Sequence, residues 1–368
     1  MERIRVIFSV SDPSPANAIQ NFLKSKASTL FNITIIASPT VSNFIGRTNE
    51  LNNLIEYSES ESINAAGHLE KLIRKNHPDI IIATVGGPNL TVNEIVMHIG
   101  HKLAVPVALL QIYPGDFNPS MNQLPDHIFC ATDFGKKITS IKLGPSRAQT
   151  PAMHVIGNLL YEHFNQINFD GIRKKERSDR GILPTDNVIL LALQPSEIYE
   201  DYRTSINLFT SAITKMPELS GLKLIISPHP NAIDDSFYLE IKKTLGKFLV
   251  EVDFSLVNRL HLIAMADVVV SAFSTCCLDA IEINKRLSDD VIRHGFVMSP
   301  KLLSEVDEYA GFSHLEFFGG DNIFQELSSV KQLLRRKYNP CFRLEIPEIT
   351  KPSYKLSNRI VDIVQGLC

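Results

Sequence analysis

Small hydroxyl residues follow an apolar run in the second half of the chain, at a point where a helix should begin. The run Asp267-Val-Val-Val ends at Ser271, and Ser274 and Thr275 come next. Unpaired backbone N–H groups at such a helix start favour a phosphate. Asp279 lies about one helical turn further on, where its carboxylate could accept hydrogen bonds from a ribose. The alternative interpretation is a plain N-cap, which Ser and Thr form in many proteins.

Two further loops of the second half carry polar residues directly after predicted strands. His229 stands between two prolines in Ser-Pro-His-Pro-Asn, and Asn231 closes this segment. Proline restricts the backbone on both sides, so the imidazole is presented rigidly and suits pyrophosphate or base recognition. Gln194 and Ser196 follow another strand, where they line the same site or only cap the next helix.

The first half offers candidates for general-base chemistry and for close backbone approach to a ligand. Gly86 and Gly87 follow a predicted strand, and paired glycines allow such an approach, although an ordinary tight turn has the same composition. The residues able to take a proton are Asp12, Asp116, His98 and Glu94. The sequence does not rank these four, and we carry Asp116, Asp12 and His98 forward as catalytic candidates.

Several familiar site patterns are absent from the sequence. There is no G-x-G-x-x-G fingerprint, no Walker-type phosphate loop, no G-x-S-x-G and no H-E-x-x-H. The five cysteines include no C-x-x-C pair, so no zinc knuckle is predicted. We therefore expect neither a metal nor an organic cofactor.

Composition limits the class of protein and its partners. The 368 residues carry a formal net charge of −3, which disfavours nucleic acid as the main partner. No apolar stretch approaches the ~20 residues that cross a bilayer. Free thiols and the lack of a signal peptide predict a cytoplasmic protein, with at most peripheral membrane contact.

Apolar runs alternate with amphipathic stretches along the chain, which predicts parallel sheets covered by helices. The alternation breaks at a charged segment and then restarts. We predict an N-terminal Rossmann-like domain over 1–165, an exposed charged linker over 166–183, and a C-terminal Rossmann-like nucleotide-binding domain over 184–368. A helix near 356–367 closes the chain, and whether it packs back on the N-terminal domain is left open.

Four segments, taken in order, resemble the GT-B superfamily of nucleotide-sugar glycosyltransferases and UDP-N-acetylglucosamine 2-epimerases. They are Pro78-Asp-Ile-Ile-Ile, Pro125-Asp-His-Ile-Phe-Cys-Ala-Thr with Val155-Ile-Gly-Asn, Ser227-Pro-His-Pro-Asn, and Ala266 to Ile281. The resemblance implies an α/β fold of two Rossmann-like domains facing each other across a cleft. It also implies that Ser274 and Thr275 bind the donor phosphate, that His229 approaches the pyrophosphate or base, and that Asp279 holds the ribose.

The function predicted from this resemblance is a metal-independent glycosyltransferase, which moves a sugar from a nucleotide-sugar donor to an unknown acceptor. The acceptor class is open and includes glycans and lipid-linked molecules. Two alternatives remain: a nucleotide-sugar 2-epimerase or hydrolase, and a non-catalytic nucleotide-binding scaffold. The epimerase needs acids and histidines close to the sugar.

Overall fold

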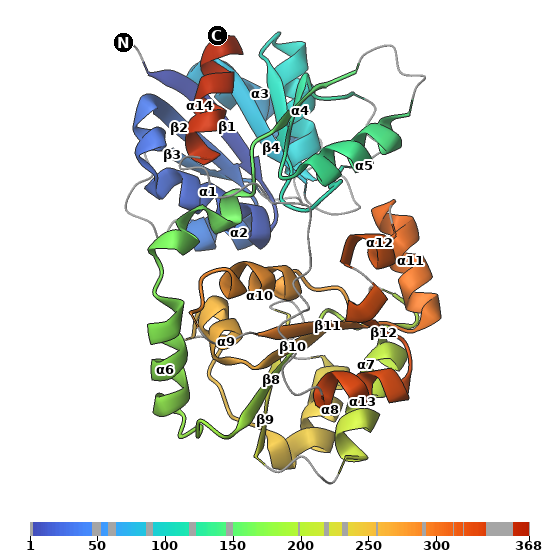
Figure 1. Cartoon of the computed structure of the whole chain (residues 1–368). Coiled ribbons are helices and arrows are strands. Elements are labelled where there is room, and N and C mark those ends of the chain that lie inside the picture. Colours follow the sequence, from blue (N-terminus) through green and yellow to red (C-terminus); the bar gives the residue numbers. More distant parts are fainter. Residues whose placement is uncertain are drawn as a thin grey trace. The chain divides into compact units, whose positions relative to one another are not determined.

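The structure is a computed structural model, drawn in Figure 1. It describes residues 3–45, 53–57, 64–85, 91–117, 123–144, 150–197, 199–216, 221–229, 235–254, 257–288, 292–311, 313–318, 320–335 and 356–367. The chain divides into two compact units. Unit 1 comprises Met1–His163 and Pro347–Cys368, and unit 2 comprises Phe164–Ile346. Each unit contains one sheet.

The sheet of unit 1 has seven parallel strands in the order β3-β2-β1-β4-β5-β6-β7. Strands β1 to β4 are labelled in Figure 1. The strands are β1 Ile4–Val10, β2 Phe31–Ala37, β3 Asn53–Glu56, β4 Ile80–Thr84, β5 Val107–Leu110, β6 His127–Cys130 and β7 Ala152–Val155. All five residues of β4 are buried, as its continuous apolar run predicts for a central strand covered on both faces. The strand order reverses between β1 and β4, which is where ligands bind in sheets of this type.

Helices cover both faces of this sheet because successive side chains of a strand point to opposite sides. On β1, Ile7 belongs to the core beneath α3 (Asn64–Asn76) and α4 (Val92–Lys102). Its neighbour Phe8 faces the other way, with its ring centroid 5.6 Å from that of Phe22 in α1 (Pro13–Lys24).

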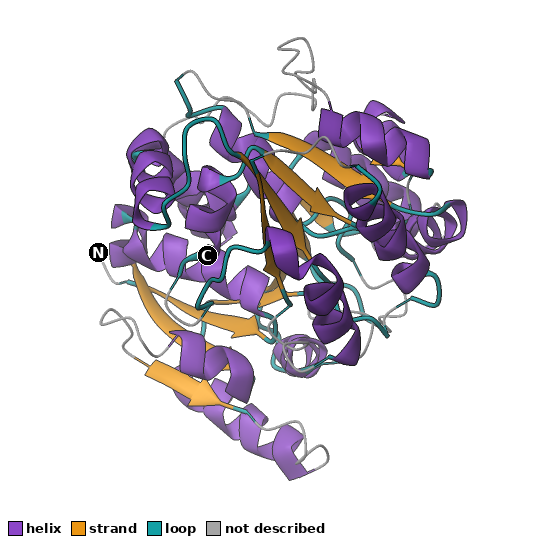
Figure 2. Cartoon of the chain, turned by 90° about the horizontal axis from the view of Figure 1, so that it is seen from below, coloured by secondary structure: helices purple, strands orange, loops and turns teal. Residues whose placement is uncertain are grey.

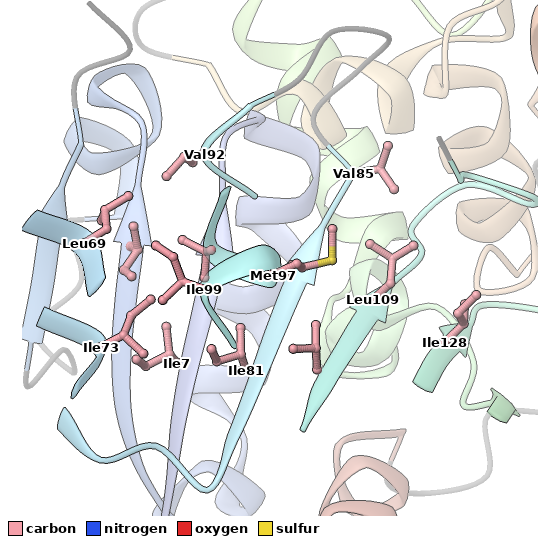
Figure 3. Packing of buried hydrophobic residues seen from close by; sticks show 14 of the residues in the cluster. Ile7, Leu69, Ile73, Ile81, Val85, Val92, Met97, Ile99, Leu109 and Ile128 are labelled. Carbon is pink, nitrogen blue, oxygen red and sulfur yellow. The ribbon is translucent and has the colours of Figure 1, made fainter. Parts of the chain in front are cut away.

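The core beneath α3 and α4 is drawn in Figure 3. Side chains from the two helices pack there against those of four strands: Leu69, Ile73, Met97 and Ile99 against Ile7, Ile81, Leu109 and Ile128. Burying each such side chain contributes roughly 1.5–3 kcal/mol. This packing fixes the strand ends that carry the polar residues.

The remaining elements of unit 1 are α2 Pro39–Ile45, α5 Asp133–Leu143, the 3₁₀-helix η1 Lys26–Leu30 and the C-terminal helix α14 Leu356–Leu367. The 3₁₀-helix η3 (Leu159–Gln166) runs from unit 1 into unit 2. Helix α14 contacts η1, so it packs within unit 1. The sequence left this destination open because an amphipathic helix does not encode which surface it covers.

The sheet of unit 2 has five parallel strands in the order β12-β11-β10-β8-β9. They are β8 Asn187–Ala192, β9 Leu222–Ser227, β10 Val268–Ser271, β11 Arg293–Val297 and β12 Ile323–Phe324. The apolar run 248–252 predicts a short strand, but this prediction is wrong in extent, because only Leu249 forms a bridge, to Leu224 of β9. This bridge still continues the sheet beyond β9, and the strand order reverses between β8 and β10.

Helices lie alongside the strands (Figure 2). Those of unit 2 are α6 Phe169–Asp179, α7 Tyr202–Thr214, α8 Ser236–Leu245, η5 Gly246–Phe248, α9 Arg259–Met265, α10 Cys276–Asn284, α11 Pro300–Ala310, α12 His314–Phe318, η6 Gly320–Asn322 and α13 Leu327–Arg335. The predicted α/β class, with two Rossmann-like halves, is confirmed. Within the described part of the chain, no helix combines the length and the apolar character needed to cross a membrane.

The segment 166–183 differs from the exposed linker that its charge predicts, because it contains α6, which packs against α9. Arg173 and Arg177 of α6 are buried and pair with the carboxylate of Asp267 at the start of β10. Arg173 also donates to the carbonyl oxygens of Ala264, at 2.9 Å, and Ala266, at 2.6 Å. Buried charges are tolerated when they are paired and hydrogen-bonded in this way.

Candidate functional site

The first turn of α10 forms the centre of the polar edge in unit 2. The backbone N–H of Ser274 donates to the hydroxyl oxygen of Ser271 at 2.6 Å. The hydroxyl oxygen of Ser274 in turn accepts from the N–H of Cys276 at 3.2 Å. Thr275 occupies the N-cap position, and its side chain makes no capping hydrogen bond. This loop directly follows β10, at the point where the strand order reverses, so α10 begins where a ligand is expected.

An arginine that the sequence analysis missed lies beside α10. Arg259, the first residue of α9, places a terminal guanidinium nitrogen 3.0 Å from Oδ2 of Asp279. The Asp279 side chain is 2% exposed, whereas that of Arg259 is 42% exposed. The charge of Arg259 also acts on the buried thiol of Cys276, although burial still raises the pKa of this thiol. The guanidinium therefore pairs with the buried Asp279 and is partly exposed to solvent near the first turn of α10.

The loop after β8 is held by its own hydrogen bonds. The N–H of Gln194 donates to the hydroxyl oxygen of Tyr202 at 2.7 Å. The N–H of Ser196 donates to Oδ2 of Asp235 at 3.2 Å, and the hydroxyl oxygen of Ser196 accepts from Arg203 at 3.2 Å. Ser196 is buried, so these contacts fix the loop.

Aromatic rings join the loops after β8 and β10. The ring of Phe273 lies 5.1 Å from that of Tyr199, perpendicular to it at 90°, and 5.8 Å from that of Tyr202. Edge-to-face pairs of this kind contribute about 0.5–1.5 kcal/mol beyond their burial. Two loops far apart in the sequence are thus coupled at the same edge of the sheet.

His229 lies two residues beyond β9, at the same edge of the sheet, and is half-buried. Asn231, Gly86 and Gly87 fall outside the described residues. Their predicted roles stay predictions.

In unit 1, the structure brings Asp116 under the influence of both Asp12 and Lys142. Burial raises the pKa of Asp116 to about 7, with the positive charge of Lys142 opposing this rise and the negative charge of Asp12 adding to it. Part of the surface of Asp116 is exposed, so solvent reaches the residue. Lys142 donates to the carbonyl oxygen of Gly115 at 2.9 Å. A carboxyl group of this kind is present in both protonation states near neutral pH.

The other acid and base candidates of unit 1 have local structural roles. The carboxylate of Asp12 caps α1 by accepting from the N–H of Ser14 at 2.9 Å. Glu94 and Thr91 form the capping box of α4. His98 is exposed on α4 and contacts Gln123, with 3.2 Å between the ring Nδ1 and the amide oxygen. No contact that the described residues make brings His98 to Asp116.

A buried polar network joins the ends of β1 and β4, and the sequence analysis missed it. The side-chain amide of Asn93 donates to the hydroxyl oxygens of Ser11 at 2.9 Å and Thr84 at 3.3 Å. Its amide oxygen accepts from the hydroxyl of Ser9 at 2.8 Å. In the sequence, Asn93 stands two residues after Thr91 at a helix start, where a polar residue usually takes part in capping. The sequence therefore gives no sign of the network. The network fixes the strand ends at the point of reversal in unit 1.

Thiol and metal chemistry find little support in the described structure. Cys130, Cys276 and Cys277 are buried free thiols, and burial raises the pKa of each, that of Cys130 to about 12. Thiols with a raised pKa are poor nucleophiles and poor metal ligands. Among the residues that the structure describes, no group of three or more His, Cys, Asp and Glu side chains is placed to hold a metal ion.

No protein-family model matches the sequence. No curated protein matches it either. Solved structures do match the fold. The structure of S. aureus MnaA with UDP has a TM-score of 0.67 and 12% sequence identity, covering 99% of this chain and 98% of that chain. The UDP-GlcNAc 2-epimerase of Neisseria meningitidis bound to UDP-GlcNAc has a TM-score of 0.65 and 13% identity, covering 99% and 100%.

A glycosyltransferase from Rickettsia africae is also similar, with a TM-score of 0.54 and 11% identity, covering 100% of this chain and 99% of that chain. At these identities the comparison establishes the fold. The predicted resemblance is confirmed at that level: the chain has the α/β fold shared by UDP-GlcNAc 2-epimerases and GT-B glycosyltransferases.

Proposed function

We propose that the protein is an enzyme that binds a UDP-linked sugar through unit 2 and inverts a carbon of that sugar, as a 2-epimerase does. The observation that carries the proposal is the pairing of Arg259 with Asp279 beside the first turn of α10. The similar structures include UDP-GlcNAc 2-epimerases crystallised with UDP-GlcNAc, which supports the epimerase alternative over the glycosyltransferase that the sequence first suggested.

The diphosphate binds at the start of α10. A helix N-terminus carries the equivalent of about half a positive charge, and its first N–H groups point toward an anion. Arg259 adds a full charge and a planar set of donors suited to phosphate oxygens. Thr275 offers a hydroxyl group that no capping bond uses. Asp279 acts on the ligand through Arg259, which differs from the ribose contact that the family resemblance implies.

Asp116 of unit 1 is the acid–base group in this proposal. Inversion at C2 balances as an elimination followed by a re-addition. A base removes the C2 proton while UDP leaves C1 with the C1–O electron pair, which gives a C1=C2 double bond; UDP then adds back to C1 as C2 takes a proton on the opposite face. A carboxyl group with a pKa of about 7 can exchange the proton on one of the two faces at neutral pH, and water can supply the proton on the other. Lys142 keeps part of the carboxyl population ionised, because its charge lowers the pKa of Asp116.

The direct test incubates the purified protein with UDP-GlcNAc, without any acceptor, and follows the sugar by ¹H NMR. The expected result is a new anomeric signal from the C2-inverted sugar, either still linked to UDP or released with UDP. An unchanged UDP-GlcNAc spectrum, together with measured UDP binding, would reject the epimerase.

A glycosyltransferase remains the second candidate, since the Rickettsia africae protein shares the fold. It would leave the nucleotide sugar intact until an acceptor is added. A scaffold without turnover would bind UDP and leave the sugar intact under every condition.

A further inference from the structure

A hollow lies at the edge of the unit 1 sheet where β5 and β6 begin, opposite the edge that carries Asp12 and Asp116. It has a volume of about 420 Å³. Its walls are His101, Ala104, Val105, Pro106, Asp126, His127 and Leu367. These residues come from the end of α4, the starts of β5 and β6, and the end of α14. Its volume falls within the roughly 300–1,000 Å³ of pockets that bind small molecules.

The acidic group of the hollow, Asp126, is held in a fixed position. Its Oδ2 accepts from the N–H of Val107 at 2.8 Å. Its own N–H donates to the carbonyl oxygen of Val107, and its carbonyl oxygen accepts from Ala152, both at 2.9 Å. The adjacent strands thus hold its backbone on both sides, and its side chain keeps 32% of its surface exposed.

The charges around the hollow favour a cation. Helix α4 ends at Lys102, next to the hollow, and a helix C-terminus carries a partial negative charge. Burial lowers the pKa of His127, against the opposing charge of Asp126, so its imidazole is neutral at pH 8. The ring Nδ1 of His101 lies 3.9 Å from Oδ2 of Asp126, too far for a hydrogen bond. The ammonium group of Lys102 donates a hydrogen bond to the carboxylate of Glu70 at 2.6 Å.

The rest of the wall is apolar. Val105, Pro106 and Leu367 offer hydrocarbon surface beside the carboxylate of Asp126. A ligand that satisfies both parts has a hydrocarbon body and one positively charged, hydrogen-bond-donating end.

We propose that this hollow binds an organic ammonium ion: a small molecule with an apolar body and a protonated amine that pairs with Asp126. Because the hollow lies at the opposite edge of the sheet from Asp116, the amine does not compete with a sugar nucleotide. The proposal is independent of the epimerase activity.

The experiment compares three probes of one shape and different charge at pH 8: cyclohexylammonium, cyclohexanol and cyclohexanecarboxylate. Binding to the full chain is followed by NMR shifts of the backbone amides of residues 101–105, 107, 126 and 127. The expected result is binding of the ammonium at least about 10-fold tighter than binding of the alcohol, a difference of about 1.4 kcal/mol. The carboxylate is expected to bind most weakly.

Two variants test the role of the carboxylate. Asp126→Asn keeps an acceptor for Val107 and should reduce ammonium binding to the level of the alcohol. Asp133→Asn, at the far end of β6, makes the same charge change and should leave binding as it is. Leu367→Lys, near the end of the chain, should abolish ammonium binding by placing a cation in the hollow. Equal binding of all three probes, or full ammonium binding by Asp126→Asn, would overturn the proposal.

Discussion

The loops at the carboxyl ends of the two sheets differ in the chemistry that they offer. In unit 2 the loop after β10 leads into the first turn of α10, and Arg259 adds a positive charge beside it. In unit 1 the loop after β5 carries Asp116, whose pKa is raised by burial to about 7. In the proposed function one edge binds an anion, and the other exchanges a proton at neutral pH.

The proposed function gives the two similar folds different tasks. Both sheets are parallel, and in both the strand order reverses near the polar residues. The backbone therefore supplies the same kind of edge twice, and the side chains decide what each edge does. In our account unit 2 binds the diphosphate and unit 1 moves the proton, so variants should separate affinity from turnover.

The largest effect is expected from Asp116→Asn. The amide cannot exchange a proton, so turnover of UDP-GlcNAc should fall by roughly 10²–10⁴-fold. UDP affinity, measured by isothermal titration calorimetry, should stay within about twofold. Asp133→Asn, an exposed acid at the start of α5, serves as the control. If Asp116→Asn weakened UDP binding and kept its turnover, the roles assigned to the units would be reversed.

The same variant should change how stability depends on pH. The folded-state pKa of Asp116 is raised from 3.8 to about 7, so only the folded protein holds this proton between those values. Its stabilising effect is complete below about pH 4 and is lost as the pH rises through 7. Relative to wild type, Asp116→Asn should therefore gain stability between pH 4 and pH 8, by at most ~4 kcal/mol. Urea unfolding at several pH values measures this gain. A difference in the free energy of unfolding that does not change with pH would argue against a raised pKa of Asp116.

Arg259→Gln should have the next largest effect, on affinity. Hydrogen bonds to charged groups contribute about 1.5–3 kcal/mol, so UDP affinity should fall by roughly 10- to 100-fold. Uridine, which has no phosphate, should bind the variant as it binds wild type. In Arg259→Gln the buried carboxylate of Asp279 loses its ion pair, which lowers stability. The double variant with Asp279→Asn removes this charge, so a loss of UDP affinity that persists in the double variant is not due to instability. Equal losses for uridine and UDP would place the arginine away from the phosphates.

The smallest effect is expected from Ser274→Ala. The hydroxyl oxygen of Ser274, the residue before the N-cap, accepts from the N–H of Cys276 in the first turn of α10, and a hydrogen bond of this kind contributes about 1 kcal/mol. UDP affinity should fall by only a few-fold, with turnover at saturating substrate unchanged. A fall as large as that of Arg259→Gln would mean that the hydroxyl binds the phosphate directly.

The sheets and the first turn of α10 could be predicted from the sequence because their signals are local. Apolar runs mark the strands, and Ser274 and Thr275 directly follow one of them. Arg259 could not be found in this way. A single arginine well before the Ser-Thr pair has no spacing signal, and only the packing of α9 beside α10 brings it to Asp279.

Helix α6 was not predicted from the sequence, because the high charge of this segment was interpreted as an exposed linker and its helical spacing was overlooked. Arg173, Glu176 and Arg177 of α6 recur at helical spacing with Arg180, the C-cap residue of this helix. A charged face normally points to solvent, so composition favoured an exposed segment. Tertiary packing reverses this, because the carboxylate of Asp267 and nearby carbonyl oxygens accept from the two buried arginines. The partner that makes burial possible lies about 90 residues away in the sequence.

Binding of the diphosphate of a UDP-sugar at the first turn of α10 can be tested by amide hydrogen exchange with and without saturating UDP. We expect UDP to slow exchange over residues 272–278 and around Arg259 more than in any other described segment. Slowed exchange confined to unit 1, with α10 unchanged, would contradict it.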